Sequence, residues 1–271
     1  MITLKVKQLP PGLVEAGNLQ PATLGALDAT ALARHPLGAT QSSPCIGDCF
    51  GIKVRGGDPI LLIEGDVPTL TGIGRSMDEG VLIVEGDSGP ETGAGMRAGE
   101  LIVKGNAGDL LGAGMRGGLI RVNGSTGHWV GAALPGAVSG MRGGSILIQR
   151  NAGDRIADRM RRGLIVVQGD TGSAAGGQML AGTLVVLGKP GPSMGSGMRR
   201  GSILVRDPSF EPGVGFSNTG AHTLGMIALL RGYLAGLDPR LARALRAFTQ
   251  AERFVGDRGC GGLGEILRAK A

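Results

Sequence analysis

The chain has 271 residues, of which 42% are hydrophobic and 18% charged, so it can bury a core and does not belong to the disordered class. Glycine accounts for 53 residues without a Gly-X-Y period, which excludes collagen. The net charge of +6 favours an acidic partner, but the aromatic content of 3% and the lack of a Lys/Arg block disfavour nucleic acid.

The cysteines and the apolar segments indicate the compartment. Cys45, Cys49 and Cys260 are an odd number of cysteines and form no disulfide framework, which is typical of a reducing compartment. The N-terminal segment lacks the apolar core of a signal peptide, and no apolar window is long enough to cross a membrane. We therefore expect a soluble, cytoplasmic protein that does not bind a membrane.

The first 56 residues differ in pattern from the middle of the chain. Residues 2–9 are typical of a strand, and residues 21–35 of a weak helix. We expect residues 1–56 to form an N-terminal capping segment.

Methionine recurs at a fixed spacing in the middle of the chain. Seven of the ten methionines are separated by steps of 19 residues, apart from one step that is seven residues longer. They are Met77, Met96, Met115, Met141, Met160, Met179 and Met198. Each is followed by glycine, then by a short run rich in Ile, Leu and Val, then by further glycine. The longer step contains an insertion with the single tryptophan, Trp129.

The apolar runs between the glycines predict strands, because they are too short for helices and glycine flanks them. The runs are residues 81–84, 101–103, 119–122, 145–148, 164–167, 183–187 and 202–205, with an imperfect earlier copy at 58–66. A period near twenty with no room for a helix in each unit predicts an all-β solenoid of about seven to eight coils. We expect the methionines to form an internal ladder and the glycines to occupy turns with positive φ.

The repeat ends after Arg206, and two segments beyond it, 224–236 and 238–254, predict one or two helices. Asp238 and Pro239 fit the N-cap and the first helical position of the second. The chain is therefore expected to comprise the capping segment 1–56, a repeat domain 57–206 and a C-terminal helical cap 207–271. The flanks are expected to cover the open ends of the solenoid.

Five arginines each follow a repeat methionine and are expected at equivalent places on successive coils. They are Arg97, Arg116, Arg142, Arg161 and Arg199. One interpretation is a solvated surface, and the other is a contact for an anionic partner. Asp78 and Leu180 interrupt the series. His128 and Trp129, in the insertion, are the best candidates for a contact with a protein partner.

No residue pattern predicts a catalytic, cofactor-binding or metal-binding site. The segment Gly112–Gly117 fits the dinucleotide fingerprint G-x-G-x-x-G, but a strand follows it where the fingerprint requires a helix. Cys45 and Cys49 lack the second pair of ligands that a zinc site needs.

Several segments carry a resemblance to a known family. The motifs are "VEAGNLQPATL" at 14–24, "IGDCFGIKVRG" at 46–56, "GMRGGSILIQRNAG" at 140–153 and "RFVGDRGCGGLGEI" at 253–266. With the repeat, they resemble the C subunit of formylmethanofuran dehydrogenase and of the bacterial formyltransferase/hydrolase complex, over nearly the whole chain. The coil "GAGMRAGELIVKGNAG" is also similar to the C-terminal domain of the glutamate synthase large subunit, which implies a right-handed β-helix.

The resemblance implies a non-catalytic structural subunit. In the bacterial complex, the formyl group of formyl-tetrahydromethanopterin passes to a methanofuran-type carrier and is released as formate, as part of formaldehyde oxidation in methylotrophs. The implied partners are a formyltransferase-like subunit, a zinc-dependent amidohydrolase-like subunit and a further subunit, which hold the carrier and the zinc. No cofactor is expected on this chain.

Three alternatives remain open. They are the C subunit of a molybdenum or tungsten formylmethanofuran dehydrogenase, an anion-binding module that uses the arginine series, and an enzyme with its own site on the solenoid.

Overall fold

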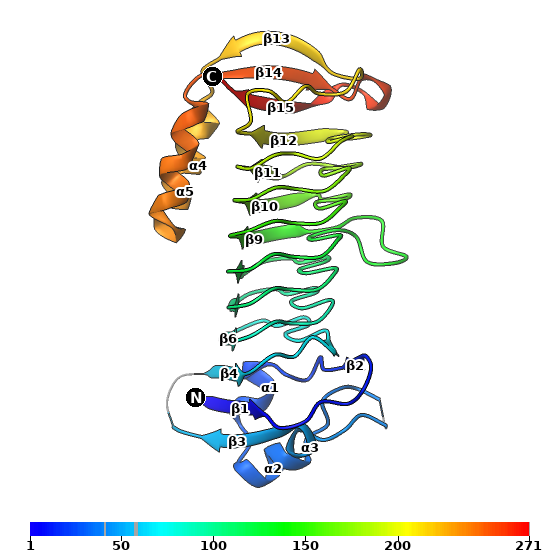
Figure 1. Ribbon diagram of the computed structural model, residues 1–271, viewed down its shortest axis with the longest axis vertical. Helices are drawn as coiled ribbons and strands as arrows, with labels where there is room; N and C mark the ends of the chain where they lie inside the picture. Colours follow the sequence, from blue (N-terminus) through cyan, green and yellow to red (C-terminus); the bar gives the residue numbers. More distant parts are fainter. Residues whose placement is uncertain (41, 57–58, 271) are drawn as a thin grey trace.

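The computed structural model describes residues 1–40, 42–56 and 59–270, and the described chain is mostly β. The strands of the large sheet are β1 (Ile2–Val6), β3 (Phe50–Val54), β4 (Ile60–Glu64), β6 (Val81–Val84), β7 (Glu100–Val103), β8 (Leu119–Val122), β9 (Arg142–Ile148), β10 (Arg162–Val167), β11 (Thr183–Val186), β12 (Arg200–Val205), β13 (Ser217–His222), β14 (Ala251–Gly256) and β15 (Leu263–Ala269). Their order is β13-β14-β15-β12-β11-β10-β9-β8-β7-β6-β4-β1-β3. Figure 1 shows them one above another along the long axis of the molecule.

Neighbouring repeats stack directly on one another. Strands β4 and β6 to β12 pair in parallel, so that Leu82 lies beside Leu101 and Leu101 beside Ile120. A second line of parallel bridges joins the opposite side of the coils; it runs through Val67, Ser88, Ala107, Thr126, Ala152 and Thr171. Each repeat therefore contributes one coil, and residues 60–205 are called the repeat stack below. The strand predictions within the repeat are confirmed to within a few residues at each end.

The spacing of methionine and glycine has a steric origin. All seven repeat methionines are fully buried. A Cβ added to Gly118 would lie 2.8 Å from the Met96 methyl and 2.8 Å from the Gly99 carbonyl oxygen, both on the preceding coil. Gly118 also has a φ of +83°. The same methyl-to-glycine approach, at 2.6–2.9 Å, recurs on every coil from Gly99 to Gly264. The methionine of one coil thus fills the space that only a glycine on the next coil leaves open.

The two halves of the stack differ on their outer face. In β6, β7 and β8 burial alternates, as expected for strands with one face in the core. In β9 to β12 the outward residues are buried as well, among them Leu147, Val166, Val185 and Leu204. They pack against Ile227, Leu234 and other apolar residues of α4 (Gly225–Leu237) and α5 (Pro239–Ala244). Asp238 begins α5 by accepting a hydrogen bond from the Arg240 backbone N–H at 2.8 Å.

The prediction that the C-terminal helices cap the end of the solenoid is therefore wrong. Figure 1 shows α4 and α5 alongside the stack instead of over its end. The cause is the continuous apolar pattern of strands β9 to β12, whose outer face must be covered. Residues 207–271 are also not helical throughout, because β13, β14 and β15 extend the sheet, with β15 parallel to β12.

The N-terminal end carries the elements predicted there, in shorter form. The strand predicted at 2–9 is β1 (Ile2–Val6), and the helix predicted at 21–35 is two helices, α1 (Pro21–Gly25) and α2 (Ala29–Arg34). A third helix, α3 (Ile46–Cys49), precedes β3. The short strands β2 (Val14–Glu15) and β5 (Leu70–Thr71) pair with each other. The predicted boundary at 56/57 and the start of the imperfect repeat at 58 adjoin or lie outside the described residues. Among the described helices, none is long and apolar enough to cross a lipid bilayer.

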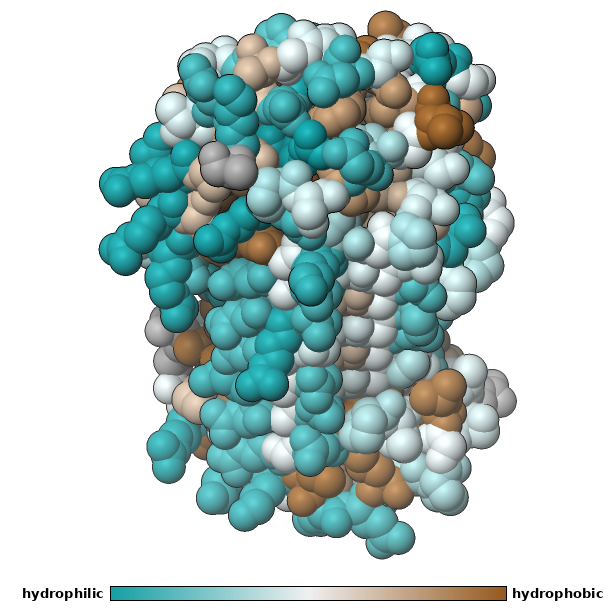
Figure 2. Space-filling view, turned by 45° about the horizontal axis from the view of Figure 1, so that its top comes forward, coloured by the Kyte–Doolittle hydropathy of each residue, from teal (hydrophilic) through white to brown (hydrophobic). Residues whose placement is uncertain are grey.

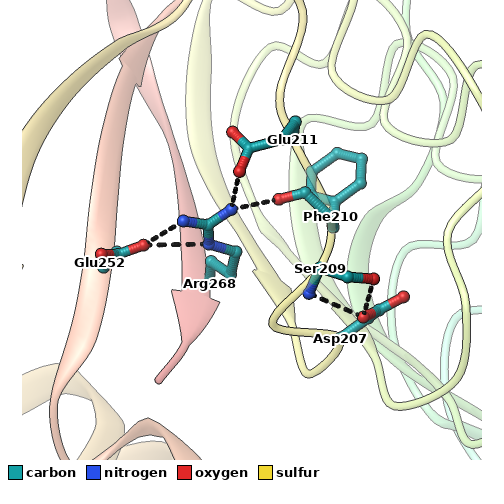
Figure 3. Close-up of polar contacts among 6 residues, drawn as sticks. All are labelled: Asp207, Ser209, Phe210, Glu211, Glu252 and Arg268. Atoms are coloured by element: carbon teal, nitrogen blue, oxygen red, sulfur yellow. Dashed lines mark hydrogen bonds and ion pairs between the residues drawn. The ribbon is translucent and has the colours of Figure 1, made fainter. Parts of the chain in front are cut away.

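An arginine joins the C-terminal strands to the segment that follows β12 (Figure 3). Arg268 on β15 pairs with Glu252 on β14 and with Glu211, and it donates to the Phe210 carbonyl oxygen at 2.7 Å. Burial lowers the pKa of Arg268, but the two carboxylates outweigh burial and raise the pKa above its usual value. Nearby, hydrogen bonds from Ser209 lower the pKa of Asp207. These contacts tie β14 and β15 to the segment that follows β12.

The insertion between the third and fourth methionines is anchored by a buried carboxylate. Asp158 is 2% exposed and bonds the Arg155 guanidinium at 2.9 Å and Arg159 Nε at 3.0 Å. Arg159 in turn donates to the Ala137 carbonyl oxygen at 3.2 Å, and its own carbonyl accepts from the Gly140 N–H at 2.8 Å. The last residues of the insertion are thus tied to the coil that follows it.

Gly118→Ala should lower the free energy of unfolding by about 3 kcal/mol, from the strained φ and the clash with the preceding coil. Gly136→Ala is the matched control, since Gly136 has a φ of +78° but no atom within 4 Å of its added Cβ. That control should cost about 1 kcal/mol, from the φ alone. Denaturant unfolding measures both, and equal losses would contradict the steric account.

Asp158→Ala should cost about 2 kcal/mol of stability, because it leaves two half-exposed guanidinium groups without their shared carboxylate. It should also speed amide hydrogen exchange in residues 134–140, which Arg159 holds in place. Asp78→Ala is the control, because Asp78 is exposed and has no ion pair among the described residues. If both variants unfold at the same denaturant concentration as the parent, Asp158 does not anchor the insertion.

Candidate functional site

The five predicted arginines lie on one edge of the repeat stack. The backbone N–H of Arg97, Arg116 and Arg142 donates to the carbonyl oxygen of the preceding coil's methionine at 2.6–2.7 Å. Arg161 and Arg199 make the same bond at 2.8 Å. All five side chains are exposed, and together they are called the arginine row.

The arginine row carries uncompensated positive charge. None of its five side chains forms an ion pair with a carboxylate of the described chain. Coils are about 4.8 Å apart, so adjacent guanidinium groups repel by about 1 kcal/mol in a water-like dielectric if they project in parallel. A bound anion would relieve this repulsion. Figure 2 shows hydrophilic side chains running along the stack beside a column of pale, small residues, with apolar patches small and separate on the face drawn.

The arginines of the row differ in whether they lie beside the insertion. Three of the row's arginines line a hollow of about 240 Å³, called the arginine hollow below. The lining residues are Arg97, Arg116 and Arg142, the turn residues Ser76, Gly95 and Gly114, and Leu134, Ala137 and Ser139 of the insertion. Arg142 Nε donates to the Oγ of the buried Ser139 at 3.1 Å. Arg161 and Arg199 belong to the row but do not line the hollow.

His128 has a structural role within a surface ladder. Its backbone N–H donates to Asp109 Oδ1 at 2.7 Å, and its Nδ1 accepts from the Asp154 backbone N–H at 2.9 Å. In the next coil, Asp154 Oδ1 accepts from the Ser173 N–H in the same way. The ring of His128 therefore substitutes for a carboxylate that links two coils.

Trp129 keeps an exposed surface beside His128. Its side chain is 40% exposed, and its ring meets His128 edge-on with centroids 5.7 Å apart. It has a φ of +57°, which is uncommon for a large residue, and Leu110 and Arg155 share this conformation on adjacent coils. An exposed tryptophan on a rigid turn suits a protein contact, and that role remains a prediction.

The cysteines show no metal-binding arrangement. Among the described residues, no group of three or more His, Cys, Asp and Glu side chains could hold a metal ion. Burial raises the pKa of the Cys49 thiol, and Asp48 and Cys45 raise it further, so this thiol is a poor ligand and nucleophile.

The sequence identified the arginines but not Ser139, nor Leu134 and Ala137, the insertion residues that line the hollow with it. The signal was the longer step between Met115 and Met141, which marks an insertion without showing where it folds. Asp158 was also missed, although an acidic residue within a glycine-rich turn is a departure from the other coils.

Comparison with known proteins places the chain. A family model for the GXGXG motif matches residues 74–215. The C subunit of the formyltransferase/hydrolase complex Fhc from Methylorubrum extorquens is 35% identical over 89 residues, an alignment that spans 33% of this chain and 33% of that relative.

A solved structure matches over the full length. It is a chain of the crystal structure of the formyltransferase/hydrolase complex (FhcABCD) from Methylorubrum extorquens in complex with methylofuran. It is 34% identical with a TM-score of 0.89, and the alignment covers 99% of this chain and 100% of that one. By its glycine-rich coils and its likeness over the whole fold, the chain belongs to the GXGXG-motif family and, within it, to the family of the C subunits of formyltransferase/hydrolase complexes.

Proposed function

We propose that this chain is a non-catalytic structural subunit of a formyltransferase/hydrolase complex, which converts formyl-tetrahydromethanopterin to formate through a formyl-methanofuran-type carrier. The observation that carries the proposal is the full-length likeness, at a TM-score of 0.89, to a chain of a complex of that name.

The chemistry is assigned to partner subunits. A formyltransferase-like subunit moves the formyl group from formyl-tetrahydromethanopterin to the carrier amine, and a zinc-dependent amidohydrolase-like subunit adds water to release formate and the free amine. A further subunit completes the assembly. The zinc and the reacting end of the carrier belong to these partners in the proposal. The complex is proposed to be cytoplasmic and to serve formaldehyde oxidation.

The finer features of the fold belong to the same proposal. We interpret the repeat stack as a right-handed β-helix, which the parallel register of β4 to β12 and the second line of bridges support. The division into 1–56, 57–206 and 207–271 likewise remains a prediction. A rigid rod of this kind offers long faces on which partner subunits can dock.

The arginine row is proposed to contact an anionic partner. Its support is the five exposed guanidinium groups on one edge without carboxylate partners among the described residues. Trp129 and His128, on the coil that begins the insertion, are proposed as a second contact. In this proposal, both surfaces contact macromolecules of the assembly.

Native mass spectrometry of the tagged chain, purified gently from its own organism, tests the assembly. We expect co-purification in a fixed ratio with formyltransferase-like and amidohydrolase-like chains. A molybdopterin- or iron–sulfur-containing assembly would establish the dehydrogenase alternative instead. A lone monomer would contradict the structural role and leave the anion-binding module as the better interpretation.

Charge reversal tests the row within the assembly. The double variant Arg116→Glu, Arg142→Glu should reduce assembly or carrier turnover at least tenfold, because attraction to the anionic partner becomes repulsion. The control is Arg34→Glu, an exposed arginine on α2 that lies outside the row. Unchanged assembly and turnover in the double variant would show that the row is solvated surface.

A further inference from the structure

We infer that the arginine hollow is a discrete binding site for an acidic peptide segment, held through its carboxylates by Arg97, Arg116 and Arg142. The inference deepens the proposed role of the row, because it separates three of its five arginines and names the ligand. It rests on the geometry of this chain, and its test does not require the complex.

Four arginines of the stack are neutralised by carboxylates, whereas others, among them Arg150, Arg162 and Arg200, have no ion pair among the described residues and do not line the arginine hollow. Arg75 pairs with Glu91, and Arg121 with Glu100 at 2.7 Å. Arg155 and Arg159 share Asp158 in the same way. The three arginines of the hollow have no such partner among the described residues. The guanidinium groups in the hollow are therefore available to a ligand.

Two contacts fix the walls of the arginine hollow before any ligand binds. Arg142 is oriented by the hydroxyl of Ser139, which is 5% exposed. The insertion is held by Arg159, whose guanidinium bonds the Ala137 carbonyl oxygen. Arginine side chains lose conformational entropy when they bind a ligand, so a site that restrains one arginine in advance loses less entropy on binding.

Small residues keep the floor of the hollow open. The hollow places Ser76, Gly95 and Gly114 at one turn position, whereas Arg159 and Gln178 occupy the equivalent position farther along the stack. A Cβ on Gly114 would project to 3.8 Å from Leu134 of the insertion. A larger side chain there would fill the space between the row and the insertion.

The size and layout of the hollow define the ligand. A volume of 240 Å³ corresponds to about eight water molecules, which is room for one or two carboxylate side chains. The three arginines lie on successive coils about 4.8 Å apart, so their charges form a line about 10 Å long. Alternate side chains of an extended peptide are about 6.6 Å apart, so two carboxylates can meet this line together. Guanidinium groups also bind carboxylates through two parallel hydrogen bonds.

The test is fluorescence anisotropy of the full chain with a fluorescein-labelled tetraglutamate peptide, with glutarate and inorganic phosphate as competitors. We expect saturable binding at low salt that weakens as salt rises, with glutarate and phosphate competing at least tenfold more weakly than unlabelled peptide. Arg116→Gln and Arg142→Gln should each weaken binding at least tenfold, and Ser139→Ala several-fold. Arg150→Gln is the matched control, because Arg150 is an exposed arginine of the stack that lies outside the row, and it should stay within twofold of the parent.

Three outcomes would overturn the inference. They are the absence of saturable peptide binding, an equal loss in Arg150→Gln and Arg116→Gln, and phosphate or glutarate competing as well as the peptide. Circular dichroism melts identify any variant that has lost its fold. If an arginine variant has, Ala137→Leu decides instead: it adds bulk at a lining position that does not have a positive φ, leaves the arginines in place and should abolish binding, and retained binding would overturn the inference. This assay uses the isolated chain. A negative result would therefore overturn the peptide site without affecting the structural role, which the native mass spectrometry tests separately.

Discussion

The fit of each methionine methyl against a glycine on the next coil fixes how successive repeats lie over one another. Met96 and Gly118 illustrate it, since no other residue at Gly118 leaves room for that methyl. Burying a methionine is worth about 2 kcal/mol, whereas two parallel arginines one coil apart repel by about 1 kcal/mol in a water-like dielectric. Packing therefore outweighs repulsion. The residue that follows each methionine is held in line with its counterparts, and the charged row is a consequence of the core.

The sequence was informative where structure is local and repeated. Gly–apolar–Gly patterns predicted strands β6 to β12 closely, and the methionine spacing predicted both the buried ladder and the alignment of Arg97 with Arg116. It was less informative at the C-terminal end. Strands β13 to β15 and the side position of α4 depend on which surfaces remain uncovered, such as Leu147 and Val166, and that is settled only by tertiary packing.

The candidate site could likewise be predicted only in part from the sequence. The arginines are visible in the sequence, but the hollow depends on an insertion whose course is set by contacts distant from it. Arg155, Ala157 and Arg159 all have positive φ in a turn where the neighbouring coils use glycine at one or two of the three positions. No propensity predicts three such residues in one turn. They are tolerated because the stacked coils on both sides impose the conformation, and Asp158 neutralises the two arginines so placed.

In this chain, shape and ligand selectivity depend on different parts of the structure. The repeat stack supplies shape and charge spacing, which cannot change without disturbing the methionine–glycine contacts. The insertion supplies selectivity, because its length and its residues at 134, 137 and 139 decide which arginines face a hollow and which face solvent. Changes there should alter ligand preference with little effect on the stack. A structural subunit of this design can therefore position a partner's acidic segment by preorganised charge, without moving its own backbone.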